Sequence, residues 1–115
     1  MMGMQGTKYR ASAEEVRAAA ELSVKRALGP AGLTRHLAAS IVAPPRGEGL
    51  KQVRHPVLVM HGIDDRVIAP ECGRFTAQCA PNSVHVPIEG MGHGFSESLM
   101  PVWSRHMIEI AQKAA

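Results

Sequence analysis

A continuous apolar run, PVLVMHG at residues 56–62, places the strongest constraint on how this chain folds. The run has the length of one strand, is rich in β-branched residues, and is bounded by Pro56 and Gly62. A strand with apolar side chains on both faces is typical of a parallel sheet that is covered on both faces. The run therefore predicts a buried strand of such a sheet.

A helix, a second strand and a final helix are predicted after this run. The helix covers residues 70–80 and begins with a proline, which suits a first helical turn. The segment SVHVPI, residues 83–88, is typical of a strand, and residues 100–115 have the pattern of an amphipathic helix. The apolar stripe of that last helix consists of Trp103, Met107, Ile110 and Ala114. Strand, helix, strand and helix form a βαβα unit, so the fold class is α/β with right-handed crossovers.

The first half of the chain is predicted to be helical. Ser12 and Glu15 form a capping box in front of a helix that stops at Gly29-Pro30. A second helix is expected over residues 31–43, before two prolines, and a short third helix over residues 47–53.

Length and composition limit the classes of protein that fit. At 115 residues the chain forms one compact domain, with residues 1–55 as a helical segment and residues 56–115 as the βαβα unit. Apolar residues make up 45% and charged residues 20%, as in globular proteins. The net charge of +3 is scattered and aromatic residues are few, so no nucleic-acid partner is expected. No apolar run approaches the roughly 18 residues that span a bilayer, and the first ten residues lack the apolar segment of a signal peptide. We therefore expect a cytoplasmic protein without a membrane partner.

The two cysteines, Cys72 and Cys79, lie seven residues apart in the helix expected over residues 70–80. That spacing separates their backbones by roughly 10 Å, which is beyond the reach of a disulfide. Together with Phe75 and Thr76 they follow the spacing of one helical stripe. We therefore expect two buried thiols in the core rather than a redox or metal site.

The candidate functional residues follow the two strands. Functional groups of open α/β sheets collect beyond the carboxyl ends of strands, where HGIDD and EGMGHGF, residues 89–95, are expected. An acidic side chain in the first loop can accept a hydrogen bond from His93 in the second. That bond would fix the imidazole tautomer and stabilise the imidazolium formed during proton transfer. The two loops thus have the acid and base of a hydrolytic triad.

The segments PVLVMHGIDDRVIAP and VPIEGMGHGF resemble the C-terminal end of the α/β-hydrolase superfamily. In that family one strand ends in a GxxD loop with the triad acid, and the next leads to a GH loop with the triad histidine. The resemblance implies that Asp65 is the acid and His93 the general base. It covers residues 56–115, and the preceding helices look like the end of a cap segment. Among subfamilies the chain is most similar to small esterases of the aclacinomycin methylesterase type.

Other polar residues near these loops are expected to be structural. Asp64 is the alternative acid, but the GxxD spacing favours Asp65 and leaves Asp64 as a loop or cap residue. His61 is expected to mark the end of the first strand, and His85 to pack in the second or face the sheet surface. A metal site built from His61, Asp65 and His93 lacks a recognised ligand spacing, so neither a metal nor a cofactor is expected.

The sequence has the glycine-rich histidine loop of the superfamily but not its nucleophile motif. Gly90, Gly92 and Gly94 are expected to let the histidine loop follow a sharp course at positive φ. The superfamily nucleophile sits on a GxSxG elbow, and the only glycines four apart here, Gly90 and Gly94, have Gly92 between them. No serine is expected to follow a strand and open a helix. Without a nucleophile and its oxyanion donors, most of the rate enhancement is lost.

Assembly is expected because two parallel strands with helices are marginal alone. An open edge on the strand PVLVM invites pairing with another chain. We therefore expect a homodimer or a higher assembly, with strands paired across a two-fold axis or helices exchanged. The alternative is a compact monomer whose N-terminal helices cover the sheet.

Two classes of function remain open. In the first, the chain is the C-terminal part of a serine hydrolase for an ester or similar acyl substrate. Its nucleophile is then supplied by another chain or by a missing N-terminal half. In the second, it is a non-catalytic module that self-associates and binds a small apolar ligand. We favour a hydrolase-derived chain without independent activity.

Overall fold

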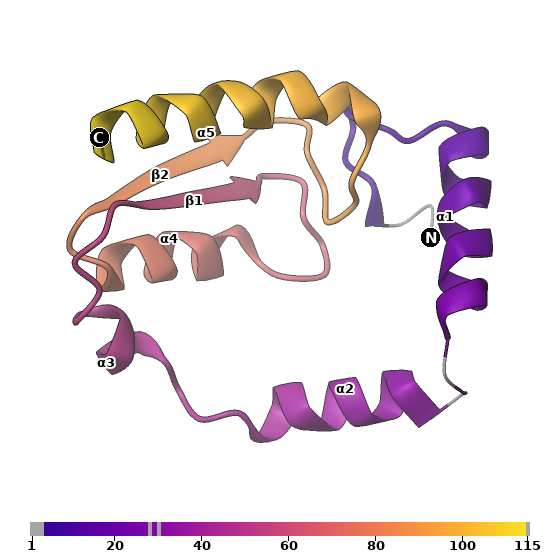
Figure 1. Cartoon of the computed structure of the whole chain (residues 1–115), viewed down its shortest axis with the longest axis horizontal. Coiled ribbons are helices and arrows are strands. Elements are labelled where there is room, and N and C mark those ends of the chain that lie inside the picture. The colour runs from indigo at the N-terminus through magenta and orange to yellow at the C-terminus, as the bar shows by residue number, and fades with distance from the viewer. Residues whose placement is uncertain (1–3, 28, 30, 115) are drawn as a thin grey trace. The chain divides into compact units, whose positions relative to one another are not determined.

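A computed structural model describes residues 4–27, 29 and 31–114 of the chain. The chain divides into two compact units, of which Ser12–Arg46 is the smaller. The larger unit consists of Met1–Ala11 and Gly47–Ala115 and contains both strands. The described residues form a mixed α/β structure of five α-helices and a two-stranded parallel sheet (Figure 1).

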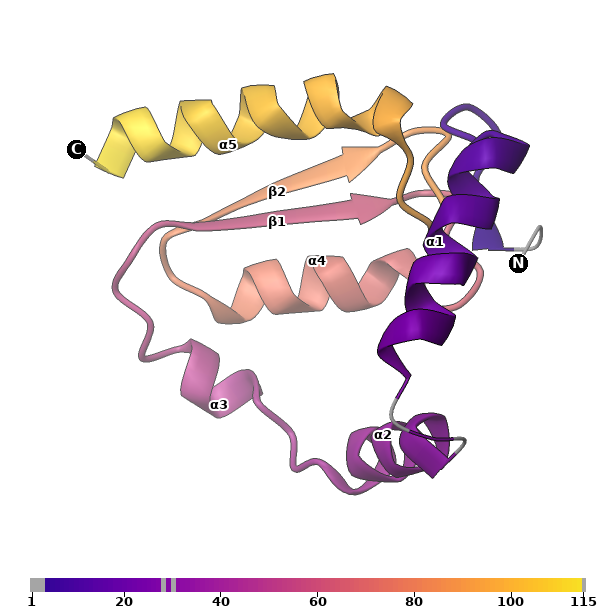
Figure 2. The same cartoon turned by 45° about the vertical axis from the view of Figure 1, so that its right-hand side comes forward.

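The sheet pairs β1 (Val57–Gly62) with β2 (Ser83–Ile88) in parallel, which confirms the two strands predicted from the apolar runs. The connecting helix α4 (Pro70–Cys79) packs on one face of the sheet, and α5 (Met100–Ala114) lies on the other (Figures 1 and 2). β1 is thus covered on both faces, as its unbroken apolar sequence requires. His85 pairs with Val59 in the register of the strands, and its buried Nε2 has no hydrogen-bond partner among the described residues.

The two edges of the sheet differ in the hydrogen bonds that they can offer. The N–H of Val57 donates to the carbonyl oxygen of Asn82 at 2.9 Å, so this residue of β1 bonds toward β2. Because backbone direction alternates along a strand, Leu58 and Met60 direct their N–H groups to the opposite edge. The same alternation turns Pro87 of β2 outward, where its missing N–H weakens pairing. β1 therefore has an open edge, whereas the edge of β2 is blunted by a proline.

The buried face of α4 differs from the prediction. The buried residues of this helix are Gly73, Ala77 and Cys79. Cys72 is exposed and Phe75 is 57% exposed, so the prediction of two buried thiols is wrong for Cys72. A Cβ at Gly73 would lie 2.6 Å from Nδ1 of His61, which shows how closely the helix approaches β1. This close approach selects the face with the smallest residues rather than the face with the largest apolar ones.

The predicted apolar stripe of α5 is confirmed at two positions and wrong at one. Trp103 and Ile110 are half-buried, whereas Met107 is 50% exposed. His106 takes its place on the half-buried face, since positions 103, 106 and 110 follow the i, i+3, i+7 spacing of one helix face. The side chain of Ala114 lies outside the described residues. The 3₁₀ turn Glu97–Leu99 precedes α5 and contains Leu99, which is fully buried.

Of the remaining helices, α1 and α2 agree with the sequence and α3 is shorter. In the smaller unit, α1 (Ala13–Arg26) begins with the predicted capping box: the Ser12 hydroxyl accepts the Glu15 N–H, and the Glu15 carboxylate accepts the Ser12 N–H. Neither α1 nor α2 (Ala31–Val42) contains a buried residue. α3 (Gly47–Leu50) is shorter than expected and belongs to the larger unit. Within the described residues, no helix is both long and apolar enough to cross a bilayer.

Candidate functional site

The loops after β1 and β2 bring Asp65 and His93 together. Nδ1 of His93 lies 2.9 Å from Oδ2 of Asp65. The Asp65 side chain is 6% exposed, and the His93 side chain is 34% exposed. A carboxylate can only accept, so Nδ1 of the neutral imidazole carries the proton and donates it. Nε2 is then unprotonated and can act as a base.

The Asp65 carboxylate is held by the backbone of its own loop. Its Oδ1 accepts the N–H groups of Val67 at 2.8 Å and Ile68 at 3.0 Å. Burial is the largest single influence on the pKa of Asp65 and raises it. Hydrogen bonds from Ile68, His93 and Val67 act in the opposite direction, and together they hold the pKa below its ordinary value of 3.8. Asp65 is therefore ionised at neutral pH and oriented from two sides.

His61 supports this carboxylate, a role that the sequence did not indicate. Its Nε2 lies 3.1 Å from the carbonyl oxygen of Ile68 and 3.5 Å from Oδ2 of Asp65. Both neighbours are acceptors, so this nitrogen carries a proton and donates. His61 is thus hydrogen-bonded to the carbonyl oxygen of Ile68 and lies close to the Asp65 carboxylate, whereas His93 is hydrogen-bonded to that carboxylate directly. Among the described residues, no group of three His, Cys, Asp or Glu side chains is arranged to hold a metal ion.

A cavity of about 260 Å³ adjoins the imidazole of His93. Its apolar side chains are Met60, Ile68, Met91 and Phe95. The Phe95 ring is supported by an edge-on contact with Trp103, at 5.0 Å between ring centroids. A base beside a cavity with apolar side chains can exchange a proton with a molecule bound there.

The N-terminal segment of residues 4–9, here called the N-terminal strap, lies against the loop that carries His93. The carbonyl oxygen of Met4 accepts the N–H of His93 at 2.7 Å and that of Gly94 at 3.1 Å. No local sequence pattern connects this segment with the site, since such patterns do not report contacts between distant parts of the chain. The strap thus fixes the backbone on which the imidazole is mounted.

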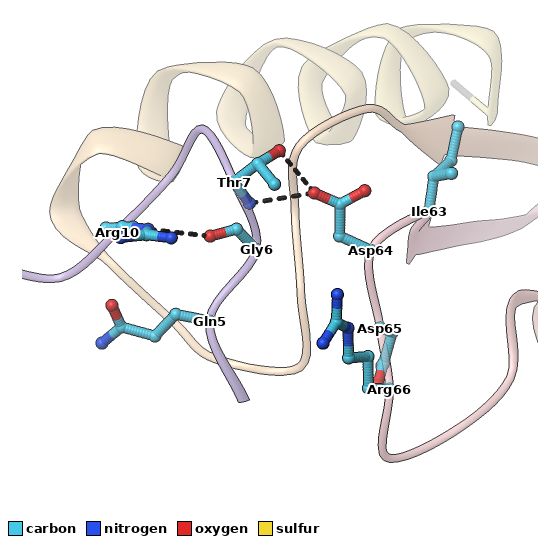
Figure 3. A pocket seen from close by; sticks show the side chains of 8 residues that line it. All are labelled: Gln5, Gly6, Thr7, Arg10, Ile63, Asp64, Asp65 and Arg66. Carbon is cyan, nitrogen blue, oxygen red and sulfur yellow. Dashed lines mark hydrogen bonds between the residues drawn. The ribbon is translucent and has the colours of Figure 1, made fainter. Parts of the chain in front are cut away.

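Asp64 anchors the strap instead of competing for the histidine. Its Oδ2 accepts the backbone N–H of Thr7 at 2.9 Å and also the Thr7 hydroxyl (Figure 3). The side-chain bond from Thr7, followed by the backbone bond, lowers the pKa of Asp64 below 3.8. The expectation that Asp64 is only a loop or cap residue therefore missed this long-range contact.

Each glycine around His93 has a different structural role. Gly90 has a φ of 77°, as predicted, and its carbonyl oxygen accepts the N–H of Lys8 at 2.9 Å. The prediction of positive φ is wrong for Gly92 and Gly94. A Cβ at Gly92 would lie 2.5 Å from the carbonyl oxygen of Met4, whereas the nearest atom to a Cβ at Gly94 would be 3.7 Å away. Gly92 is therefore required by the close approach of the strap rather than by backbone conformation.

Ser83 and Ser96, which lie nearest in sequence to the loops after β1 and β2 respectively, are engaged elsewhere. Ser83 donates to the carbonyl oxygen of Ala77 on α4, and the Ser96 hydroxyl donates to the carbonyl oxygen of Tyr9. Among the described residues, no serine, threonine or cysteine lines the cavity beside His93. The site therefore provides an oriented base and an apolar cavity, and within the described part of the chain that cavity has no hydroxyl or thiol of its own.

Comparison of the chain with protein-family models and with curated proteins finds no match.

Proposed function

We propose that this chain carries the acid and the base of a serine-esterase-like α/β-hydrolase and depends on a nucleophile from outside the chain. The hydrogen bond between Asp65 and His93 carries this proposal, because it joins the two loops that follow parallel strands. In this interpretation β1, α4, β2 and α5 are the C-terminal βαβα portion of the hydrolase fold. The helices α1 to α3 are then a cap-like segment.

The chemistry assigned to each residue follows from its contacts. An attacking hydroxyl would give its proton to Nε2 of His93 while its oxygen bonds to the ester carbonyl carbon. Asp65 would stabilise the resulting imidazolium through Nδ1, and the imidazolium would return the proton to the leaving alkoxide. The cavity lined by Met60 and Met91 suits the apolar part of a small ester.

The proposal predicts a base that works on an added nucleophile. We expect the chain with p-nitrophenyl butyrate and ethanol to form ethyl butyrate about tenfold faster than the His93→Ala variant. The alcohol supplies the attacking oxygen, and His93 removes its proton. Ethyl butyrate is measured by gas chromatography, which separates transesterification from hydrolysis. His106→Ala is a matched control, since it removes an imidazole on α5 that lies outside the cavity.

Two results would count against this assignment. Equal ethyl butyrate formation by the chain and its His93→Ala variant would show that the imidazole is not a working base. Labelling of the chain by a fluorophosphonate probe without alcohol would show that it contains an activated serine. The first result removes the role of the dyad, and the second removes the need for an outside nucleophile.

A non-catalytic, self-associating module is the second candidate, and the asymmetry of the sheet edges supports it. Leu58 and Met60 leave the outer edge of β1 open, whereas Pro87 blunts that of β2. A homodimer with β1 paired to β1 of a second copy across a two-fold axis would extend the sheet at the edge whose N–H groups are free to pair. The cavity beside His93 would then hold a small apolar ligand without turnover.

Self-association through β1 predicts a mass of twice 12.3 kDa by light scattering. Leu58→Pro removes an outward N–H and is expected to give a folded monomer. Val59→Pro is the matched control, because it removes an N–H that points toward β2, and it is expected to lose the circular dichroism of the folded chain. A monomeric wild-type chain, or a Leu58→Pro variant that remains dimeric, would contradict pairing at this edge.

A further inference from the structure

A second cavity, of about 390 Å³, lies between the N-terminal strap and the loop after β1 (Figure 3). From the N-terminal side it is lined by Gln5, Gly6, Thr7 and Arg10. From the loop it is lined by Ile63, Asp64, Asp65 and Arg66. Its volume falls within the range of small-molecule sites, and none of these residues has a part in the proton transfer proposed above except Asp65.

The hydrogen-bonding capacity left in this cavity is mostly that of donors. The four charged groups are two carboxylates and two guanidinium groups, so formal charge alone selects no ligand. Oδ2 of Asp64 accepts from Thr7, Oδ1 of Asp65 accepts from two backbone N–H groups, and Oδ2 of Asp65 accepts from the His93 imidazole. The two acidic side chains are therefore largely used within the protein.

The two guanidinium groups are much less engaged. Arg10 uses only Nε, which donates to the carbonyl oxygen of Gly6 at 3.2 Å. Arg66 makes no hydrogen bond to another described residue, and its interaction with Asp64 is purely coulombic. Figure 3 shows Arg66 extending from the loop toward the strap, while Arg10 and Gln5 lie on the strap side. The terminal nitrogens of both arginines can thus donate to a bound molecule.

We propose that this cavity binds a small monocarboxylate, held by Arg66 and Arg10 and contacted along its alkyl part by Ile63. A guanidinium presents paired N–H groups in one plane, which match the two oxygens of a carboxylate. A neutral amide has one acceptor oxygen where a carboxylate has two, and a cation would meet the two guanidinium groups as well as carboxylates that already accept hydrogen bonds within the protein. The inference goes beyond the proposed function, because neither His93 nor a nucleophile takes part in the binding.

The experiment titrates the chain with sodium butyrate and follows the Nε–H signals of Arg66 and Arg10 by ¹H–¹⁵N NMR. Butyramide serves as the neutral analogue, and sodium chloride at equal ionic strength controls for screening. We expect saturable shifts with butyrate and at least about tenfold weaker binding of butyramide, since hydrogen bonds to charged groups exceed 1 kcal/mol. Chloride is expected to produce no saturable shift.

Variants identify the site and separate it from the dyad. Arg66→Gln and Arg10→Gln are each expected to weaken butyrate binding about tenfold, while Arg74→Gln, which changes an exposed arginine on α4, leaves it unchanged. His93→Ala is expected to bind butyrate as the wild-type chain does. Equal binding of butyrate and butyramide, or full binding by Arg66→Gln, would overturn the proposal. Loss of binding in His93→Ala would place the carboxylate at the dyad instead, and failure of the transesterification experiment would leave this result unaffected.

Discussion

Replacing Asp65 with asparagine is expected to lower the free energy of unfolding by about 3 kcal/mol at neutral pH. The change keeps the size of the side chain but removes a buried charge that accepts bonds from Val67, Ile68 and His93. One carboxylate oxygen becomes an NH₂ group, and in either orientation of the amide this donor lies against another N–H donor. Urea denaturation measures the loss. Glu89→Gln is the matched control, because it removes an exposed charge from the loop after β2 and is expected to be neutral.

The same substitution is expected to change how stability depends on pH. The pKa of Asp65 is lowered in the folded chain, so its stabilising contribution is fully present above the pKa of the unfolded chain. It is lost as the pH falls through the lower, folded pKa. Unfolding curves between about pH 5 and pH 2 should therefore show a shallower loss of stability in Asp65→Asn than in the wild-type chain. Asp64 has a lowered pKa as well, so part of the slope should remain. Identical slopes would contradict the assigned state of Asp65.

Gly92→Ala is expected to destabilise the larger unit by about 3 kcal/mol, whereas Gly94→Ala should change stability by less than about 0.5 kcal/mol. The two glycines flank His93, but only the Cβ added at Gly92 would collide with the strap. Thermal unfolding measures both effects. The two variants form a matched pair, since each adds one methyl group to the same loop.

Hydrogen exchange gives this prediction a local readout. The N–H groups of His93 and Gly94 are protected by the carbonyl oxygen of Met4, so they should exchange faster when the strap is displaced in Gly92→Ala. Gly94→Ala should leave both rates unchanged. Unchanged protection in Gly92→Ala would mean that the strap does not hold the histidine loop.

Local patterns in the sequence predicted the helices and strands and the meeting of the two loops that carry Asp65 and His93. Pro70, the capping box at Ser12 and the apolar runs of β1 and β2 act within a few residues, so their effect could be predicted without tertiary structure. Parallel strands then place the loops after them at one edge of the sheet. This geometry explains why the proximity of the two loops could be predicted, whereas the choice of Asp65 over Asp64 came from the resemblance to the hydrolase superfamily.

Features that depend on packing between distant segments could not be predicted in this way. Thr7 bonds to Asp64, which is 57 residues away in the sequence, and no periodic pattern reports such a contact. The buried face of α4 was misjudged because hydropathy favours Phe75, while the close approach at Gly73 favours small residues. The role of Gly92 was missed for the same reason, since the atoms that a Cβ at this position would meet belong to the distant strap.

The position of the strap bears on how the protein should be handled at the bench. A purification tag fused ahead of the strap would lie close in the sequence to the Met4 carbonyl oxygen that accepts the N–H groups of His93 and Gly94, and its bulk would compete with that contact. Figures 1 and 2 show α5 ending near the opposite end of the sheet, where the two strands begin. Affinity handles and fluorophores therefore belong at the carboxyl end, where they leave the amino-terminal docking undisturbed.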